Sequence, residues 1–324
     1  MTSVLTLVPG QPALFTDYAT RWELESIVQE LRAARERWRN SHQRSSGFST
    51  REFPCMSTLN NITESLCGVL FPMRLGPPAL RQESEDFYIG YTLEMALDRL
   101  FQQVRLELRY QRRCNGEDLI GVDEKAATIV QVFSRQLPEL RSILDADVEA
   151  AYLGDPAAAS VDEVLLCYPG ILAVIYYRIA HALYRLGAPL IARMISEIAH
   201  SKTAIDIHPG AQIGAGFFID HGTGVVIGET TIIGQRVRLY QAVTLGAKRF
   251  TQDANGMLEK GNCRHPILED DVVIYAGATI LGRITIGKGS SIGGNVWLTH
   301  SVPPNSQVTQ ANLRQELADT LISI

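Results

Sequence analysis

The stretch IHPGAQIGAGFFIDHGTGVVIG, residues 207–228, begins a pattern in which a bulky aliphatic residue returns at every sixth position. The pattern covers Ile207, Ile213, Ile219, Val225, Thr231, Val237 and Val243 and, after an irregular interval, Leu268, Ile274, Ile280, Ile286, Ile292 and Leu298. Thr231 is the one member that is not aliphatic. A period of six fits neither an amphipathic helix nor a two-sided strand. It fits a parallel β-helix in which each hexad forms one side of a triangular coil, so about four coils are predicted.

The size and composition of the chain limit its class. Its 324 residues are enough for two domains, and a net charge of −5 argues against a nucleic-acid binder with a basic surface. Five cysteines, none in CxxC spacing, fit free thiols in a reducing cytoplasm better than a disulfide framework. No apolar run reaches eighteen residues, and the N-terminus lacks the basic start of a signal peptide. We therefore expect a cytoplasmic protein that binds neither a membrane nor nucleic acid.

The residues before the β-helix are predicted to be helical. Apolar residues recur at helical spacing in the segments 22–40, 57–70, 83–113, 123–144 and 168–199. Pro138 is expected to bend or break one helix, and Gly187–Pro189 to bend another. The fold class is therefore α+β. An α-helical N-terminal domain (1–200) precedes a β-helix domain (201–303) and a C-terminal tail (304–324), in which the residues from Gln307 onward have helical character.

A triangular β-helix has flat faces and an open end, and both favour self-association. A closed three-fold arrangement is the simplest result, so we expect a homotrimer or a dimer of trimers. The segment 244–267 interrupts the sixfold pattern and is too long for one hexad. It should leave the coil as a loop, and loops on a rigid scaffold are common sites of binding residues.

Ionisable residues gather near the start of the β-helix and at the end of this loop: Asp206, Asp220, His221, Arg264 and His265. His221 could take a proton from a hydroxyl group, because histidine titrates near neutral pH. Asp206 lies fourteen residues before Asp220. We place the two on neighbouring coils, close enough for Asp206 to orient His221. The guanidinium of Arg264 suits a substrate carboxylate.

Asp155 and Asp220 could hold an ammonium group, so the set predicts a site for a zwitterionic amino acid with a hydroxyl group. The alternative is that histidines at the corners of a β-helix are solvated or capping residues, and we interpret His208 in that way. The histidines also lack the short His-x₃₋₅-His spacing of many zinc sites, so no metal is expected.

An ordered series of motifs across residues 150–303 resembles the serine O-acetyltransferases, hexapeptide-repeat enzymes of cysteine biosynthesis. The motifs are Gly-Asp-Pro-Ala (154–157), Asp-Ile-His-Pro (206–209), Ile-Asp-His-Gly-Thr-Gly-Val-Val-Ile-Gly-Glu-Thr (219–230), Val-Thr-Leu-Gly-Ala (243–247), Arg-His-Pro (264–266) and Ala-Gly-Ala-Thr-Ile-Leu-Gly (276–282). The resemblance implies a left-handed β-helix that transfers acetyl from acetyl-CoA to L-serine, with cysteine competing for the serine site.

The resemblance also implies roles by position. His221 would be the general base, oriented by Asp206. Serine would attack the thioester directly, without an acyl-enzyme intermediate. Asp155 and Asp220 would hold the ammonium, Arg264 the carboxylate, and His265 serine or the developing oxyanion. Acetyl-CoA would lie between adjacent β-helices against the backbone of Gly246, Ala247, Ala276 and Gly294, where small residues allow close approach. We interpret Cys263 as part of the loop rather than as a nucleophile.

Three features depart from the family pattern: Ala247 stands where a glycine is usual, the loop 248–263 is long, and the tail after Pro304 differs. The resemblance implies that Ile324 could bind O-acetylserine sulfhydrylase as a partner. Two other functions remain open from the sequence. One is acyl transfer to homoserine or a sugar, and the other is a non-catalytic regulatory subunit that docks a partner through its tail.

Overall fold

The computed structural model describes residues 22–41, 53–249 and 256–311. The chain divides into two compact units, Met1–Glu52 and Phe53–Ile324. In the first unit the described residues form α2 (Leu24–Ser41), which confirms the helix predicted at 22–40. Ile324, the predicted contact with a partner enzyme, lies outside the described residues.

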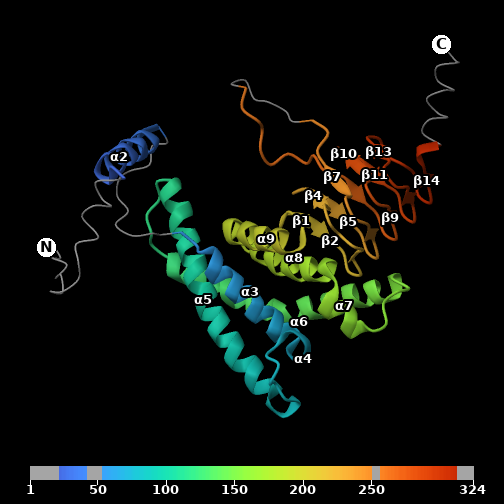
Figure 1. Cartoon of the computed structure of the whole chain (residues 1–324), viewed down its shortest axis with the longest axis horizontal. Helices are drawn as coiled ribbons and strands as arrows, with labels where there is room; N and C mark the ends of the chain where they lie inside the picture. Colours follow the sequence, from blue (N-terminus) through green and yellow to red (C-terminus); the bar gives the residue numbers. More distant parts are fainter. Residues whose placement is uncertain (1–21, 42–52, 250–255, 312–324) are drawn as a thin grey trace. The chain divides into compact units, whose positions relative to one another are not determined.

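The second unit begins with helices (Figure 1), which confirm most of the predicted segments. They are α3 (Met56–Leu70), α4 (Pro72–Leu75), the 3₁₀ helix η1 (Gln82–Ser84), α5 (Glu85–Cys114), α6 (Val122–Gly154), α7 (Val161–Cys167), α8 (Pro169–Arg185) and α9 (Pro189–Thr203). The predicted interruption near Gly187–Pro189 is the gap between α8 and α9.

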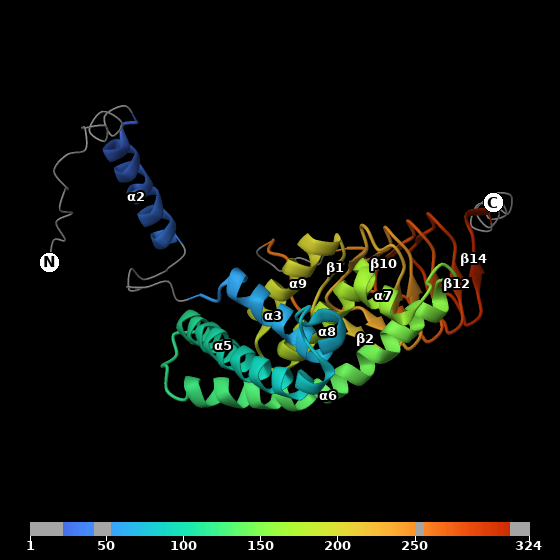
Figure 2. The ribbon, with the colours of Figure 1, turned by 60° about the horizontal axis from the view of Figure 1, so that its bottom comes forward.

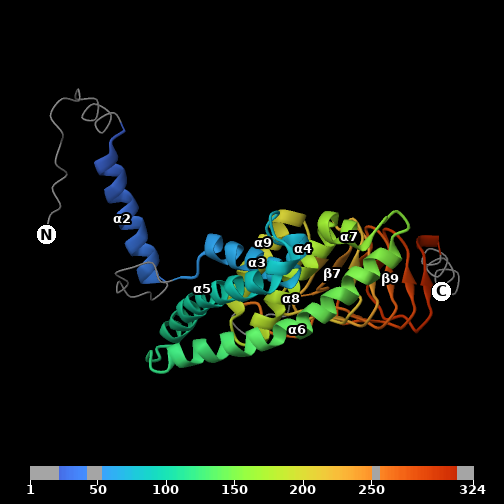
Figure 3. The same ribbon diagram turned by 90° about the horizontal axis from the view of Figure 1, so that it is seen from below.

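Of the bend or break expected at Pro138, the break does not occur, because α6 continues through this residue to Gly154. Leu137, Leu140 and Leu144 around it are buried, so packing of the helix face compensates for the lost backbone donor. Figure 3 shows α6 extending from α5 past α8 toward the β-helix. The C-terminal end of α6 thereby brings Asp155 to the β-helix.

A buried ion pair connects the helices to the first coil. The guanidinium of Arg178 on α8 donates to both carboxylate oxygens of Asp147 on α6, at 3.0 Å each. Arg178 also donates to the carbonyls of Ile213 and Gly214, and Asp147 accepts the N–H of Phe217 at 2.8 Å. Removing one partner would leave a buried charge unpaired, which typically costs about 3–5 kcal/mol. The pair therefore fixes both helices against the β-helix.

Strands of two or three residues form the β-helix, and their parallel pairing produces three sheets (Figure 2). Sheet A contains β1 (Asp206–Ile207), β4 (Val226–Ile227), β7 (Thr244–Gly246), β10 (Thr279–Leu281) and β13 (Trp297–Leu298); sheet B contains β2 (Gln212–Ile213), β5 (Ile232–Ile233), β8 (Ile267–Leu268) and β11 (Thr285–Ile286); sheet C contains β3 (Phe218–Ile219), β6 (Arg238–Leu239), β9 (Val273–Ile274), β12 (Ser291–Ile292) and β14 (Gln307–Val308). The strands complete four coils and part of a fifth, as predicted.

The sixfold pattern has one discontinuity that the sequence analysis missed. Between β3 and β4 the turn has six residues, 220–225, whereas the later turns from sheet C to sheet A have four. The two extra residues shift the pattern, so the strand residues that face the core next are Ile227 and Ile233 rather than Val225 and Thr231. Thr231, like Val225, lies at a buried corner rather than in a strand.

Two further segments can be compared with the predictions. Between β7 and β8 the described residues contribute no strand to the three sheets, which confirms a loop outside the coil. The predicted helical character from Gln307 is wrong at its start, because Gln307–Val308 forms β14 and pairs with β12. Within the described residues no single helix is long and apolar enough to cross a membrane; α7 and α8 together pass that test but are bent by 74°.

Candidate active site

The long turn between β3 and β4 presents Asp220 and His221 at the corner between sheets C and A. The backbone of His221 is left-handed (φ 57°) and Gly222 follows with φ 84°. A Cβ at position 222 would lie 2.4 Å from Ile205 Cδ1, so glycine is needed there. This backbone turns His221 outward, leaving its side chain 70% exposed with Nδ1 3.6 Å from Asp220 Oδ1. An exposed imidazole beside a largely buried carboxylate is available to accept a proton from a bound hydroxyl group.

Asp155 joins this corner from the end of α6. Its carboxylate accepts the Tyr168 hydroxyl at 2.5 Å and the Ala157 N–H at 2.8 Å. These two hydrogen bonds, the Tyr168 bond first, lower the pKa of Asp155, and the same bond raises the pKa of Tyr168 to about 12. The charges of His221 and Arg238 act on Asp155 as well, so the residues are close in space. We call Asp155, Tyr168, Asp220 and His221 the His221 group.

A second group lies at the other edge of sheet A, at the corner with sheet B. Arg264 ends the long loop and donates to Glu229 at 2.8 Å, while the Arg264 N–H donates to the Thr230 hydroxyl oxygen at 3.0 Å. Burial raises the pKa of Glu229, but the hydrogen bond from Arg264 and nearby positive charge outweigh it and lower the pKa. Glu229 therefore fixes the direction of the guanidinium. We call Glu229, Thr230, Arg264 and His265 the Arg264 group.

His265 is only 6% exposed, and its Nδ1 lies 3.0 Å from the Thr230 N–H and 2.9 Å from the Thr230 hydroxyl. Because a backbone N–H can only donate, Nδ1 accepts, and a neutral ring then carries its proton on Nε2. Burial, followed by the charge of Arg264, lowers the pKa of His265 to about 4. His265 is therefore a neutral hydrogen-bond donor at pH 7. Gly228 makes room for the ring, since a Cβ there would lie 2.1 Å from His265 Cδ2.

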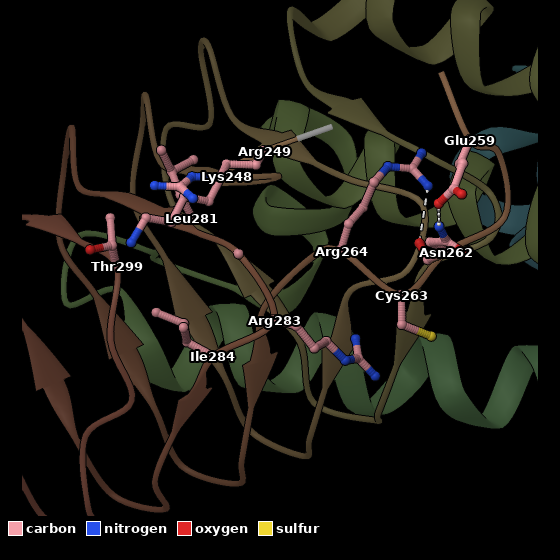
Figure 4. Close-up of a pocket in the computed structure, with 11 residues that line it drawn as sticks. Lys248, Arg249, Glu259, Asn262, Cys263, Arg264, Leu281, Arg283, Ile284 and Thr299 are labelled. Atoms are coloured by element: carbon pink, nitrogen blue, oxygen red, sulfur yellow. Dashed lines mark hydrogen bonds between the residues drawn. The ribbon is translucent and has the colours of Figure 1, made fainter. Parts of the chain in front are cut away.

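A cavity of about 320 Å³ adjoins the Arg264 group (Figure 4). Its lining includes four cationic side chains, Lys248, Arg249, Arg264 and Arg283. Cys263 also lines it and is exposed. Arginine and lysine are the side chains that bind phosphate groups, so this cavity suits an anionic ligand.

The residues predicted to contact acetyl-CoA are divided between the same two corners. Gly246 ends β7 and Ala247 follows it, at the corner between sheets A and B. Ala276 and Gly294 lie in the turns after β9 and β12, at the corner between sheets C and A. A Cβ at Gly294 would lie 3.2 Å from the Ala276 carbonyl oxygen, so these two turns stack directly.

The structure places Asp206 differently from the prediction. Asp206 on β1 and Asp220 after β3 belong to the same coil, because β1, β2 and β3 make one turn of the β-helix. Among the described residues Asp206 makes no hydrogen bond to His221. Its carboxylate instead lies within 4.8 Å of ligand-type atoms of Glu197 and His200 on α9. The carboxylate beside His221 in the structure is Asp220.

One chain therefore brings the predicted residues together in two halves rather than in one site. The His221 group holds the predicted base and the two carboxylates predicted to bind the ammonium, and the Arg264 group holds the guanidinium and His265. Sheet A lies between them and exposes Val226 (38%) and Trp297 (65%). Tyr168, Glu229 and Thr230 were missed by the sequence analysis, although the last two stand inside the motif 219–230.

Comparisons with known proteins show which family this chain resembles. Residues 265–300 match the family model of the bacterial transferase hexapeptide (six repeats). The chain is 52% identical to a plasmid serine acetyltransferase of Synechococcus elongatus over 304 residues, or 93% of this chain and 95% of that protein. The structure is similar to Entamoeba histolytica serine acetyltransferase 1 in complex with L-cysteine, with 39% identity, a TM-score of 0.67 and coverage of 77% and 86%. It is also similar to Neisseria gonorrhoeae serine acetyltransferase in complex with serine, with 27% identity, a TM-score of 0.50 and coverage of 78% and 94%.

Proposed function

This chain belongs to the serine acetyltransferase family, and from that premise we propose that two copies of the chain share each active site. The enzyme transfers acetyl from acetyl-CoA to the hydroxyl group of L-serine, giving O-acetylserine and CoA in cysteine biosynthesis. Its β-helix is the left-handed hexapeptide solenoid predicted from the sequence. The His221 group of one copy faces the Arg264 group of the next.

The separation of the two groups on opposite edges of sheet A carries this proposal. Serine is a small zwitterion, and its ammonium, hydroxyl and carboxylate must be contacted at once. A closed head-to-tail ring joins one edge of each protomer to the other edge of its neighbour. Such a ring of three copies completes three sites and covers the exposed Val226 and Trp297 of sheet A. The predicted acetyl-CoA residues are divided in the same way, so the same contact forms both halves of the cofactor groove.

In the shared site, Asp155 and Asp220 hold the serine ammonium and Arg264 of the neighbouring copy binds the carboxylate. His221 takes the hydroxyl proton as the serine oxygen attacks the thioester carbonyl. The tetrahedral intermediate collapses with release of the CoA thiolate, and the His221 imidazolium returns the proton to that sulfur. The Nε2–H of His265 donates to the carboxylate or to the oxyanion.

Two carboxylates compete for the orienting role on His221. The family resemblance assigns it to Asp206, whereas Asp220 lies 3.6 Å from His221 Nδ1 in this structure. We propose that Asp206 takes this role when the exposed imidazole turns toward sheet A, leaving Asp220 for the ammonium. The β-helix domain (201–303) supplies every residue of the site except Asp155 and Tyr168, which come from the helical domain (1–200).

The cationic cavity extends the same proposal to acetyl-CoA. Lys248 and Arg249 follow Ala247 directly along the chain and line the cavity beside the groove (Figure 4). They would face the phosphates of CoA while the pantetheine lies along Gly246 and Ala247. The mechanism uses no metal, because thiolate is a competent leaving group and a neutral base suffices.

The substrate is tested by thiol release from acetyl-CoA with L-serine, L-homoserine or an amino sugar as acceptor. We expect kcat/KM for L-serine to exceed that for L-homoserine by about 10–200-fold, the range that one methylene group commonly decides. The amino sugar has no carboxylate for Arg264 and should give no more than background release. L-cysteine should compete with L-serine. Equal rates with serine and the amino sugar would reject a site built for a zwitterion.

We also propose that the segment Leu321–Ile324 binds O-acetylserine sulfhydrylase. Its support is the apolar sequence Leu-Ile-Ser-Ile, which could occupy an apolar pocket of a partner. Deleting Ile324 should weaken binding to the sulfhydrylase by at least about tenfold in a titration calorimeter, because an isoleucine contributes about 1.5–3 kcal/mol when fully buried. Acetyl transfer should be unaffected. An unchanged affinity for the sulfhydrylase would show that this residue is not the contact.

A further inference from the structure

Helix α2 exposes an apolar stripe along its whole length. None of its residues is buried, although it carries large hydrophobic side chains. Those of Leu24, Ile27, Val28, Leu31 and Trp38 are each exposed by 46–53%. A helix gains most of its stability in proteins from burying such a face. The sequence of α2 therefore points to another surface that covers it.

The spacing of the stripe identifies the kind of surface. Leu24, Ile27, Leu31, Ala34 and Trp38 follow one another at alternating intervals of three and four residues. This is the a and d pattern of a coiled coil, which packs best against a second helix with the same pattern. We propose that α2 forms a parallel coiled coil with α2 of neighbouring copies of this chain.

Charges beside the stripe favour a second copy of α2 in parallel. With Leu24 at position a, Glu30 is at position g and Arg35 at position e. In a parallel coiled coil a g residue faces the e residue five positions further along the neighbouring helix, so Glu30 meets Arg35 of the next copy. The pairing is repeated in every helix of the assembly, which gives each copy both a donor and an acceptor.

A membrane surface is the main alternative occupant, and the charges argue against it. Helices that bind anionic membranes concentrate lysine and arginine on the polar face and keep the apolar face free of charge. In α2, three glutamates (Glu25, Glu30, Glu36) nearly balance four arginines (Arg32, Arg35, Arg37, Arg39). Arg35 also directly borders the apolar stripe, seven residues after Val28 and four after Leu31, where a membrane-bound helix would carry an apolar residue.

The residues at a and d also indicate how many helices assemble. Leucine at a with isoleucine at d, as in Leu24 and Ile27, favours three or four strands over two. Three is the number of copies in the ring proposed for the active site, and the coiled coil relies on that proposal for its stoichiometry. Joining the helices to one trimer raises their effective concentration, which compensates for the shortness of α2.

Adjacent alanines offer a matched test in the full-length protein. Ala34 is at position d of the stripe, whereas Ala33 lies on the opposite side of the helix. Under mild oxidation the Ala34→Cys protein should form disulfide-linked dimers at least about tenfold faster than Ala33→Cys, because only the seam brings the same position of two helices together. The parent chain corrects for linking through native cysteines. Equal rates at the two positions, or no linking at 34, overturn the proposal.

Charge reversal tests the parallel pairing directly. In the Ala34→Cys background, Glu30→Arg should slow the linking and adding Arg35→Glu should restore it. Slowing without restoration contradicts the pairing of Glu30 with Arg35. Flotation of the parent protein with vesicles of anionic phospholipid would instead assign the stripe to a membrane. Light scattering separates this inference from the proposed active site: a trimer that fails to link at position 34 rejects only the coiled coil, whereas a monomer rejects the shared site as well.

Discussion

Replacing His221 with alanine is expected to lower kcat/KM for acetyl transfer to L-serine by about 10²–10⁴-fold, the usual contribution of a general base. A serine hydroxyl is a weak nucleophile at neutral pH, and the imidazole of His221 is the exposed nitrogen base of the His221 group. Its side chain is 70% exposed, so its removal leaves no cavity in the core. The measurement is the rate of CoA thiol release, with the mass of the assembly and thermal unfolding recorded alongside.

His300→Ala serves as the matched control, because His300 is also exposed but belongs to neither group. This variant should retain the parent rate. Gly222 permits the turn that directs His221 outward. A larger residue at position 222 should therefore also lower the rate, by changing the backbone that holds His221. Activity of His221→Ala within a few-fold of the parent would rule out His221 as the base and would require another group to take the hydroxyl proton.

The sequence predicted the β-helix because each strand places one aliphatic residue in the core, and that requirement is local. The same local pattern misled at residues 220–225. After the two extra residues of this turn, a count of every sixth residue falls on corner positions instead of strand positions. The count continues without a break because the corner residues Val225, Val237 and Val243 are also buried and aliphatic. The one sign was Thr231, the exception in the pattern. The insertion is also where Asp220 and His221 lie, so the departure from the repeat coincides with the chemistry.

The partners of the site residues depend on pairing between coils, which a single sequence does not display. Glu229 with Arg264 and Thr230 with His265 are both separated by thirty-five residues. The register of β5 with β8 has the same offset, because Ile232 is opposite Ile267. The offset of thirty-five residues is the length of one coil plus the long loop. These pairs can therefore be predicted only when the residues that belong to the loop are known. Tyr168 was missed for a related reason, since its bond to Asp155 joins the ends of separate helices.

Two inactive variants are expected to restore each other when they assemble together. His221→Ala removes the base at one edge of sheet A, and Arg264→Ala removes the carboxylate contact at the other. Each site needs an intact His221 edge from one chain and an intact Arg264 edge from its neighbour. In trimers formed at random from equal amounts of both variants, each of these requirements is met with a probability of one half, so a quarter of all sites are intact. About a quarter of the parent activity should therefore return in the whole co-expressed population, and about a third once tag purification has removed the homotrimers, although each variant alone is nearly inactive.

A second mixture supplies the control that decides between a shared and a single-chain site. Asp220→Asn and His221→Ala damage the same edge, so in their mixed trimers no site receives an intact His221 group, and activity should stay at the level of the separate variants. If the site were contained in one chain, both mixtures would remain equally inactive. Recovery only in the mixture that combines the two edges would require contact between the corner of sheets C and A in one copy and the corner of sheets A and B in the next. The mass of the complementing assembly then separates a head-to-tail ring of three from a two-fold pair, because two copies packed through sheet A about a two-fold axis also place unlike edges together.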